Sequence, residues 1–150
     1  MSIIKDLEQY NENNIFFCEP IKNNIMNDGT FIRIMYCSEC FTMNGIALLI
    51  TLNDSMVEQY YNKYKCSFNP LYHKDIIDKV KNIEESLLNQ VNITNKIPQF
   101  KIYEQLKNGN IKLFFENNGK TKLYMLKISG IWETDKNYGA TYKFAKITHL

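Results

Sequence analysis

Apolar and polar residues alternate with a period of two over several short segments, the pattern of half-buried strands. Before residue 70 this pattern predicts three strands: "NIFFCEPI", which Pro20 interrupts; "FIRIMYC", after the turn signal "NDGT"; and the buried run "GIALLITL", which Gly45 opens. The next segment, "DSMVEQYYNKYK", is predicted as a short helix. Asp54 or Ser55 stands there at a capping position, and Glu58 lies near the capping-box position.

A clearer amphipathic pattern follows in "NPLYHKDIIDKVKNIEESLLNQV". Asn69 is suited to cap a helix and Pro70 to occupy its first position. The apolar residues then form one stripe at helical spacing: Ile76, Ile77, Val80, Ile83, Leu87, Leu88 and Val91. The pattern predicts a helix over about 70–91 that lies across a core, with His73 an ordinary exposed residue near its start.

After Pro98 the sequence again has the character of strands. "FKIYEQL", "IKLFFEN", "TKLYMLKISGIW" and "GATYKFAKIT" are separated by "KNGN", "NNGK" and "ETDKNY". The first two separators contain Asn-Gly, the favoured dipeptide of short hairpins. The whole chain, residues 1–150, is thus predicted to be one mainly β (α+β) domain with a long helix between strands three and four. That order is the order of the OB-fold, an antiparallel oligonucleotide-binding barrel, although other α+β folds share it.

Composition sets broad limits on the class of protein. A chain of 150 residues with 45% hydrophobic content is long enough to bury a core. No apolar stretch approaches the roughly 18 residues that span a bilayer, so no membrane association is predicted. The opening "MSIIKDLEQYNENN" turns polar at once and does not read as a secretory signal. We therefore expect an intracellular, reducing compartment.

Four cysteines raise the question of a metal site. Cys37 and Cys40 have the spacing of a zinc half-site, which Cys18, Cys66 or His73 would complete. A second close pair, which most structural zinc sites have, is missing from the sequence. We expect reduced structural cysteines, no metal and no cofactor.

Charge is distributed unevenly along the chain. Residues 1–95 contain 8 Lys and Arg against 12 Asp and Glu, whereas residues 96–150 contain 10 Lys against 4 Asp and Glu. Clustered lysines release counterions from a nucleic-acid backbone, so the basic part suits a polyanion. The alternative interpretation is a lysine-rich solvated surface.

The segment "SGIWETDKNYGATYKF" contains the chain's one tryptophan within a predicted hairpin. Strand alternation puts Tyr142 and Phe144 on one face and Lys143 on the other, so either the two rings or the lysine faces the core. Trp132 stands two residues after Gly130, where a bulge can turn it outward. Gly139 is predicted to serve a bulge or a close backbone approach.

Lysines and aromatic residues interleave along these strands. Sequence-indifferent binding of single strands needs this combination, because cations follow the backbone while rings stack on any base, at roughly 1–3 kcal/mol each. Lysine is a point charge, which suits phosphate contacts better than bidentate reading of bases. Lys101 adds a cation on a neighbouring predicted strand. The candidate nucleic-acid-binding residues are Trp132, Lys143, Tyr142, Tyr138, Lys136, Lys127, Lys122, Lys112 and Tyr124.

Enzymatic signatures are missing from the sequence. It has no phosphate-cradling glycine-rich loop, no nucleophile elbow and no HExxH motif. Its two histidines, His73 and His149, stand in unrelated positions. The sequence therefore predicts a protein that is not an enzyme.

The last hairpin resembles a C-terminal stretch of small single-stranded DNA-binding proteins of large eukaryotic DNA viruses, which are similar to the short-tailed-phage replication type. The residues that carry this resemblance are Ile128, Gly130, Ile131, Trp132, Glu133, Tyr138, Gly139, Tyr142, Lys143 and Phe144. The resemblance implies an OB-fold and a role in replication or repair of a viral genome, alongside replication proteins, in the host cytoplasm or nucleus. The phage-type proteins end in an acidic tail that contacts partners, whereas this sequence ends "KFAKITHL". The resemblance therefore does not extend to partner recruitment.

Two functional hypotheses follow. In the first, the protein coats single-stranded DNA, or RNA, without regard to sequence. In the second, a virion structural or interaction protein uses the same fold to bind protein, with Trp132 in the core and the lysines scattered.

Overall fold

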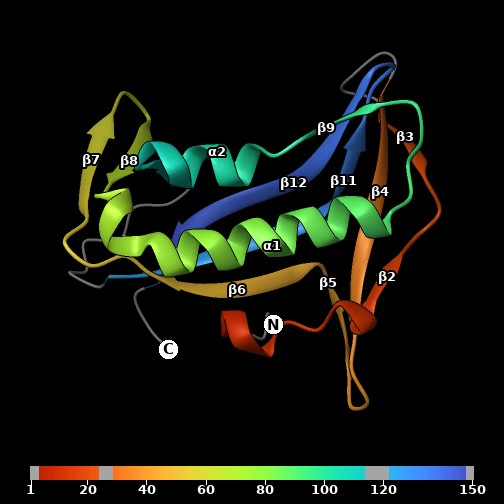
Figure 1. Cartoon of the computed structure of the whole chain (residues 1–150), viewed down its shortest axis with the longest axis horizontal. Helices are drawn as coiled ribbons and strands as arrows, with labels where there is room; N and C mark the ends of the chain where they lie inside the picture. The colour runs from red at the N-terminus through yellow and green to blue at the C-terminus, as the bar shows by residue number, and fades with distance from the viewer. Residues whose placement is uncertain (1–3, 24–28, 114–121, 148–150) are drawn as a thin grey trace.

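The computed structural model describes residues 4–23, 29–113 and 122–147. They form a curved β-sheet with two α-helices packed against one face (Figure 1). The strands are β1 (Ile4–Lys5), β2 (Ile15–Phe17), β3 (Ile21–Asn23), β4 (Gly29–Cys37), β5 (Thr42–Asn44), β6 (Ile46–Thr51), β7 (Met56–Tyr60), β8 (Lys63–Ser67), β9 (Ile97–Gln99), β10 (Asn110–Leu113), β11 (Leu123–Glu133) and β12 (Asn137–Lys146). The helices are α1 (Lys74–Gln90) and α2 (Lys101–Asn108), with short 3-10 helices η1 (Leu7–Gln9), η2 (Glu12–Asn14) and η3 (Pro70–His73).

The sheet is open and mixed. Its main path runs β1-β6-β11-β12-β10-β8-β7, and β4 pairs with β11, β2, β3 and β5. The prediction of a mainly β fold with one long helix is confirmed. Closure into an OB-fold barrel is not confirmed, because among the described residues β1 and β7 end the path without meeting.

The β11–β12 hairpin is the centre of the sheet. On its outer edge β11 pairs first with β6 and then with β4, and the change of partner falls at a register shift between Ile128 and Gly130. The strands predicted over "FIRIMYC", "GIALLITL" and the last hairpin are confirmed by β4, β6, β11 and β12. Pro20 separates β2 from β3, as the interruption of the first strand predicts.

Helix α1 covers the concave side of this sheet (Figure 1). The Asn69 side chain accepts a hydrogen bond from the Leu71 amide, and Pro70 opens η3, which leads directly into α1. The predicted apolar stripe is largely buried, with Leu87 and Leu88 completely inside. The helix over 70–91 is therefore confirmed, with its first turn in 3-10 form. His73 is buried, so its prediction as an exposed residue is wrong.

A buried carboxylate fastens α2 to α1. Both oxygens of Glu84 accept hydrogen bonds from backbone amides at the start of α2, from Ile102 at 3.0 Å and from Tyr103 at 2.9 Å. These amides have no partner within their own helix, so Glu84 does the work of an N-terminal cap. Burial raises the pKa of Glu84 to about 7, against the lowering effect of these two bonds.

Two predicted elements are wrong. The segment predicted as a short helix from Asp54 is the β7–β8 hairpin, which turns at Tyr61 with a positive φ of 57°. The predicted strand "FKIYEQL" is α2, in which Ile102 and Leu106 lie four residues apart and are both buried. The "KNGN" segment is accordingly the end of this helix, where Gly109 adopts the left-handed conformation, and not a hairpin turn.

Other predicted turns lie partly or wholly outside the description. "NNGK" and the first two residues of "NDGT" are outside the described residues, while "ETDKNY" connects β11 to β12 as predicted. Within the described part of the chain, no helix combines the length and apolar character needed to cross a bilayer.

Candidate nucleic-acid interface

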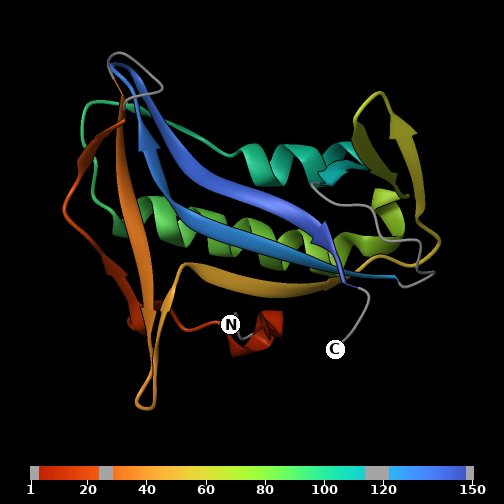
Figure 2. The ribbon, with the colours of Figure 1, turned by 180° about the vertical axis from the view of Figure 1, so that it is seen from behind.

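The face of the sheet opposite α1 and α2, called here the back face, is turned toward the viewer in Figure 2. On β12, Phe144 is buried on the helix side, and the Tyr142 hydroxyl accepts a hydrogen bond from the Gln105 side chain of α2. Lys143 and Thr141 consequently point to the back face. Of the two arrangements open at the sequence level, the rings face inward and the lysine faces outward.

The register shift in β11 decides where Trp132 points. Up to Ile128, the residues of even number share the buried helix side with Tyr142 and Phe144 of β12. Ser129 is an extra residue, and beyond it Gly130 pairs with Thr141 and Trp132 pairs with Gly139. A bulge of one residue exchanges the two faces of the strand. Of the two positions open to Trp132 at the sequence level, the bulge places it on the back face, where its side chain is partly exposed.

Trp132 and Phe31 lie across glycines of neighbouring strands. A Cβ atom on Gly139 would lie 2.8 Å from Cζ2 of Trp132, and one on Gly130 would lie 2.5 Å from Cζ of Phe31. Both contacts are too close for any side chain at these positions. Each ring therefore lies over bare backbone on the back face, as the predicted close approach at Gly139 requires.

These rings belong to one row across the sheet. Register places Ile21, Phe31, Trp132, Gly139 and Gln99 side by side on β3, β4, β11, β12 and β9. Ile21 at the end of the row is 56% exposed. We call Phe31 and Trp132 the ring platform.

Cations flank the ring platform on the same face. Arg33 is exposed and stands opposite Gly130, and Lys127 pairs in register with Lys143. On the next strands Lys112 stands opposite Lys65. Carboxylates are scarce on this face. Among the described residues of β4, β7, β8, β10, β11 and β12, the register places one carboxylate there, Glu58 of β7.

Several lysines on the helix side are paired, since Lys79, Lys81, Lys96 and Lys101 each lie within 4.0 Å of a carboxylate. One of these pairs reaches β11, where Nζ of Lys96 lies 2.7 Å from Oε2 of Glu133. The hydrogen bond from Lys96 lowers the pKa of Glu133. Lys74 of α1 and Lys107 of α2 form no ion pair within the described residues. Lys101 stands on α2, so its prediction as a strand cation is wrong. Within the described residues, Lys65, Lys112, Lys127 and Arg33 form no ion pair.

Comparison with protein-family models, curated proteins and solved structures finds no match. The structure itself is therefore the basis for assigning a function.

Of the three tyrosines of the predicted site, two are buried and the third, Tyr142, is partly exposed. Tyr124 is 1% exposed and Tyr138 6% exposed, both on the helix side of the sheet. The Tyr124 hydroxyl lies 2.9 Å from Oγ of Ser55, and burial raises its pKa. Burial also raises the pKa of Tyr142, whose ring contacts Phe144 edge to face. Tyr124 and Tyr138 belong to the core and Tyr142 packs against it, since strand alternation places all three on the face opposite the lysines.

The remaining predicted residues are on the surface. Lys122 is exposed just before β11, Lys136 is exposed in the β11–β12 turn, and Lys112 is exposed on β10. Sequence reasoning missed Phe31 and Arg33. The alternation in "FIRIMYC" already placed these two residues on one face, but not beside Trp132.

The proposed cysteine ligands do not gather. Cys66 is buried in the core, where desolvation raises its thiol pKa, whereas Cys40 is exposed at the β4–β5 turn. Among the described residues no three His, Cys, Asp or Glu side chains come together as a metal site would require.

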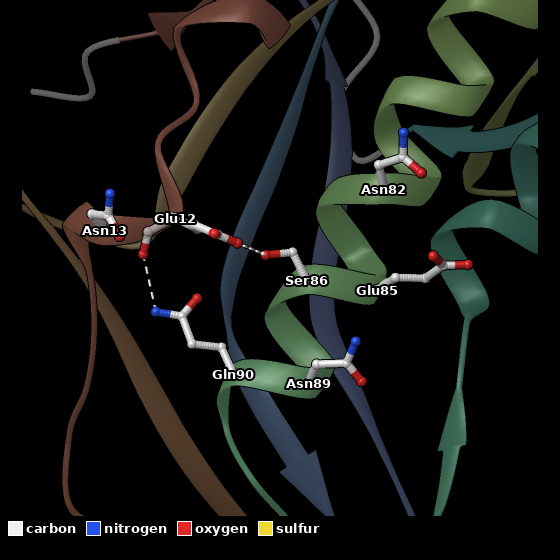
Figure 3. Close-up of a pocket in the computed structure, with 7 residues that line it drawn as sticks. All are labelled: Glu12, Asn13, Asn82, Glu85, Ser86, Asn89 and Gln90. Carbon is white, nitrogen blue, oxygen red and sulfur yellow. Dashed lines mark hydrogen bonds between the residues drawn. The ribbon is translucent and has the colours of Figure 1, made fainter.

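A polar cavity of about 520 Å³ lies on the helix side, between η2 and α1 (Figure 3). Two hydrogen bonds connect its walls: Ser86 donates to the Glu12 carboxylate at 2.7 Å, and Gln90 donates to the Glu12 carbonyl at 2.9 Å. Asn82, Glu85 and Asn89 also line it. This lining contains carboxylates and amides but no cation and no aromatic ring, so it does not suit a polyanion.

Proposed function

We propose that the protein binds single-stranded nucleic acid on the back face of its sheet, without regard to sequence and without catalysis. The observation that carries this proposal is the ring platform with cations on the same face. Rings packed against bare backbone at the surface suit stacking by unpaired bases, which have a π-face whatever their identity.

The cations supply the second requirement. Lys127 and Lys143 stand directly opposite each other, so two positive charges lie side by side on the back face. A phosphate backbone is the polyanion that such a group of cations attracts. The lysines among these cations are single charges, which suit sequence-tolerant binding of phosphates.

The resemblance of the last hairpin supports single-stranded DNA as the ligand and replication or repair of a viral genome as the setting. It also supports a relationship to the OB-fold, as an opened form of that barrel. The rival hypothesis, a virion structural or interaction protein, needs Trp132 in the core and dispersed lysines. The partly exposed Trp132 and the gathered cations favour nucleic acid.

The test is a comparison of single-stranded and duplex oligonucleotides of the same sequence by fluorescence anisotropy. We expect tighter binding of the single strand, because the bases of a duplex are stacked on one another and unavailable to the rings. Equal affinity for both forms would mean that binding depends on charge alone and not on stacking of bases on the rings. No binding to either form would overturn the proposal.

A further inference from the structure

A second cavity, of about 490 Å³, lies at the far end of the sheet. It is enclosed by the β7–β8 hairpin, β10 and the last turn of α2, and we call it the end pocket. Its lining includes Tyr60, Lys63, Tyr64, Lys65, Asn108 and Lys112. The volume falls within the roughly 300–1,000 Å³ of small-ligand sites.

The charges of the end pocket are unbalanced. Lys65 and Lys112 face each other across β8 and β10, an unfavourable pairing of like charges. Glu58 is the cross-strand neighbour of Lys65 on its other side, yet it makes no ion pair with Lys65 among the described contacts. Lys63 adds a third positive charge to the same lining. This excess of positive charge suits an anionic ligand.

The pocket also provides aromatic surface. Tyr60 is 64% exposed, and an edge-to-face contact with Tyr61 at 4.7 Å holds its ring. Tyr60 stands opposite Lys63 in the hairpin register, so a ring and a cation are neighbours. Rings beside cations suit a base joined to a phosphate, and the amide of Asn108 adds a hydrogen-bonding group at the rim.

A row of lysines on the back face leads from the ring platform to β10 and β8, the strands that form one wall of the end pocket; Gln105 and Asn108 of α2 form the other. Leu113 of β10 pairs in parallel with Phe144 of β12, so Lys112 and Lys143, which immediately precede them, fall together on the back face. Lys127 pairs with Lys143 on the other side. A row of four lysines thus crosses β11, β12, β10 and β8, from Lys127 to Lys65.

We propose that the end pocket is a second subsite for the same strand, which holds one base against Tyr60 and the adjoining phosphates on Lys65 and Lys112. This inference rests on the proposed function, because the strand reaches the pocket from the ring platform along the lysine row. The bound strand therefore covers two separated stacking sites on one protein molecule.

The test uses oligo-dT of increasing length, over the roughly 4–16 nucleotides typical of one such domain. Wild type is compared with Tyr60→Ala and with the double variant Lys65→Gln/Lys112→Gln, and Lys81→Gln on α1 is the matched control. All four altered side chains are at the surface or partly exposed, and thermal melting checks that each variant is folded. Anisotropy reports affinity, while the emission of Trp132 reports the platform.

We expect wild-type affinity to rise with length until both subsites are filled. Tyr60→Ala and the double variant should bind the longest strand about 10-fold or more weakly, yet bind the shortest strand, with its change in Trp132 emission, as wild type does. If wild type binds all lengths and the variants match it throughout, the end pocket is not a subsite while the proposed function stands. If wild type binds no oligonucleotide, both proposals fall.

Discussion

The indole of Trp132 lies across Gly139 of the neighbouring strand, with Cζ2 2.8 Å from the position that a Cβ of Gly139 would occupy. One residue on β11 thus depends on the absence of a side chain on β12. This contact fixes the position of the partly exposed ring on the back face, where we propose that bases stack on it.

Gly139→Ala should displace the ring. The added Cβ would also lie 2.9 Å from the carbonyl oxygen of Gln99, which is backbone and cannot easily move away. We expect a loss of about 1–3 kcal/mol in the free energy of unfolding, typical of overpacking, and a shift in tryptophan emission. Thr141→Ala, on the same strand and face, is the control and should leave the emission unchanged. A Gly139→Ala protein with wild-type stability and emission would show that the ring does not lie there.

Trp132→Ala should separate binding from stability. Removal of the Trp132 side chain should cost roughly 1–3 kcal/mol of the free energy of binding to single strands. Because the side chain is partly exposed, the free energy of unfolding should fall by a smaller amount than this. Phe144→Ala, which empties a buried site, should instead cost about 3–5 kcal/mol of unfolding free energy. Denaturant melts and anisotropy measure the two quantities. If Trp132→Ala lost more unfolding free energy than Phe144→Ala, Trp132 would be a core residue.

Lys127→Ala should weaken binding to all sequences alike. It removes a cation of the back face, so the slope of log K against log salt should become shallower by about 0.7. Lys81→Ala, which removes a lysine paired with Glu85 on α1, is the matched control and should leave the slope unaltered. The same change of slope in both variants would mean that position on the sheet does not matter.

Much of the architecture could be predicted from the sequence because it depends on local patterns. The alternation in β4, β6 and β11–β12 and the apolar stripe of α1 each identify an element by themselves. The β7–β8 hairpin and α2 could not be assigned in this way. The β7–β8 hairpin is stabilised by pairing of β8 with β10, for example of Cys66 with Ile111. Helix α2 is stabilised by the cap that Glu84 of α1 provides. Both are contacts between residues far apart in the sequence.

The candidate site was predictable only in part for the same reason. Alternation already separates Lys127 from Tyr124, but it does not say which of them faces the core. The bulge at Ser129 exchanges the faces midway along β11, so Trp132 shares the face of Lys127 although their spacing is odd. The pairing of β4 with β11, which brings Phe31 to Trp132, has no local signal.

Stability should depend on pH through Glu84. Burial raises its pKa in the folded protein to about 7, above the ordinary value of 4.5, so the folded state holds this proton more tightly than the unfolded chain. The contribution of Glu84 to stability is therefore greatest below about pH 4.5 and is lost as pH rises toward 7. In Glu84→Gln, which keeps one acceptor oxygen, melting temperature should change less with pH over this interval. Parallel melting curves for the two proteins would contradict this role.

Tryptophan emission during titration with oligo-dT at low salt tests the central claim most directly, because the chain has one Trp. The account predicts a saturable change in Trp132 emission that salt reverses and that the matching duplex does not produce at the same concentrations. Unchanged emission, together with no shift of the oligonucleotide in a native gel, would contradict it.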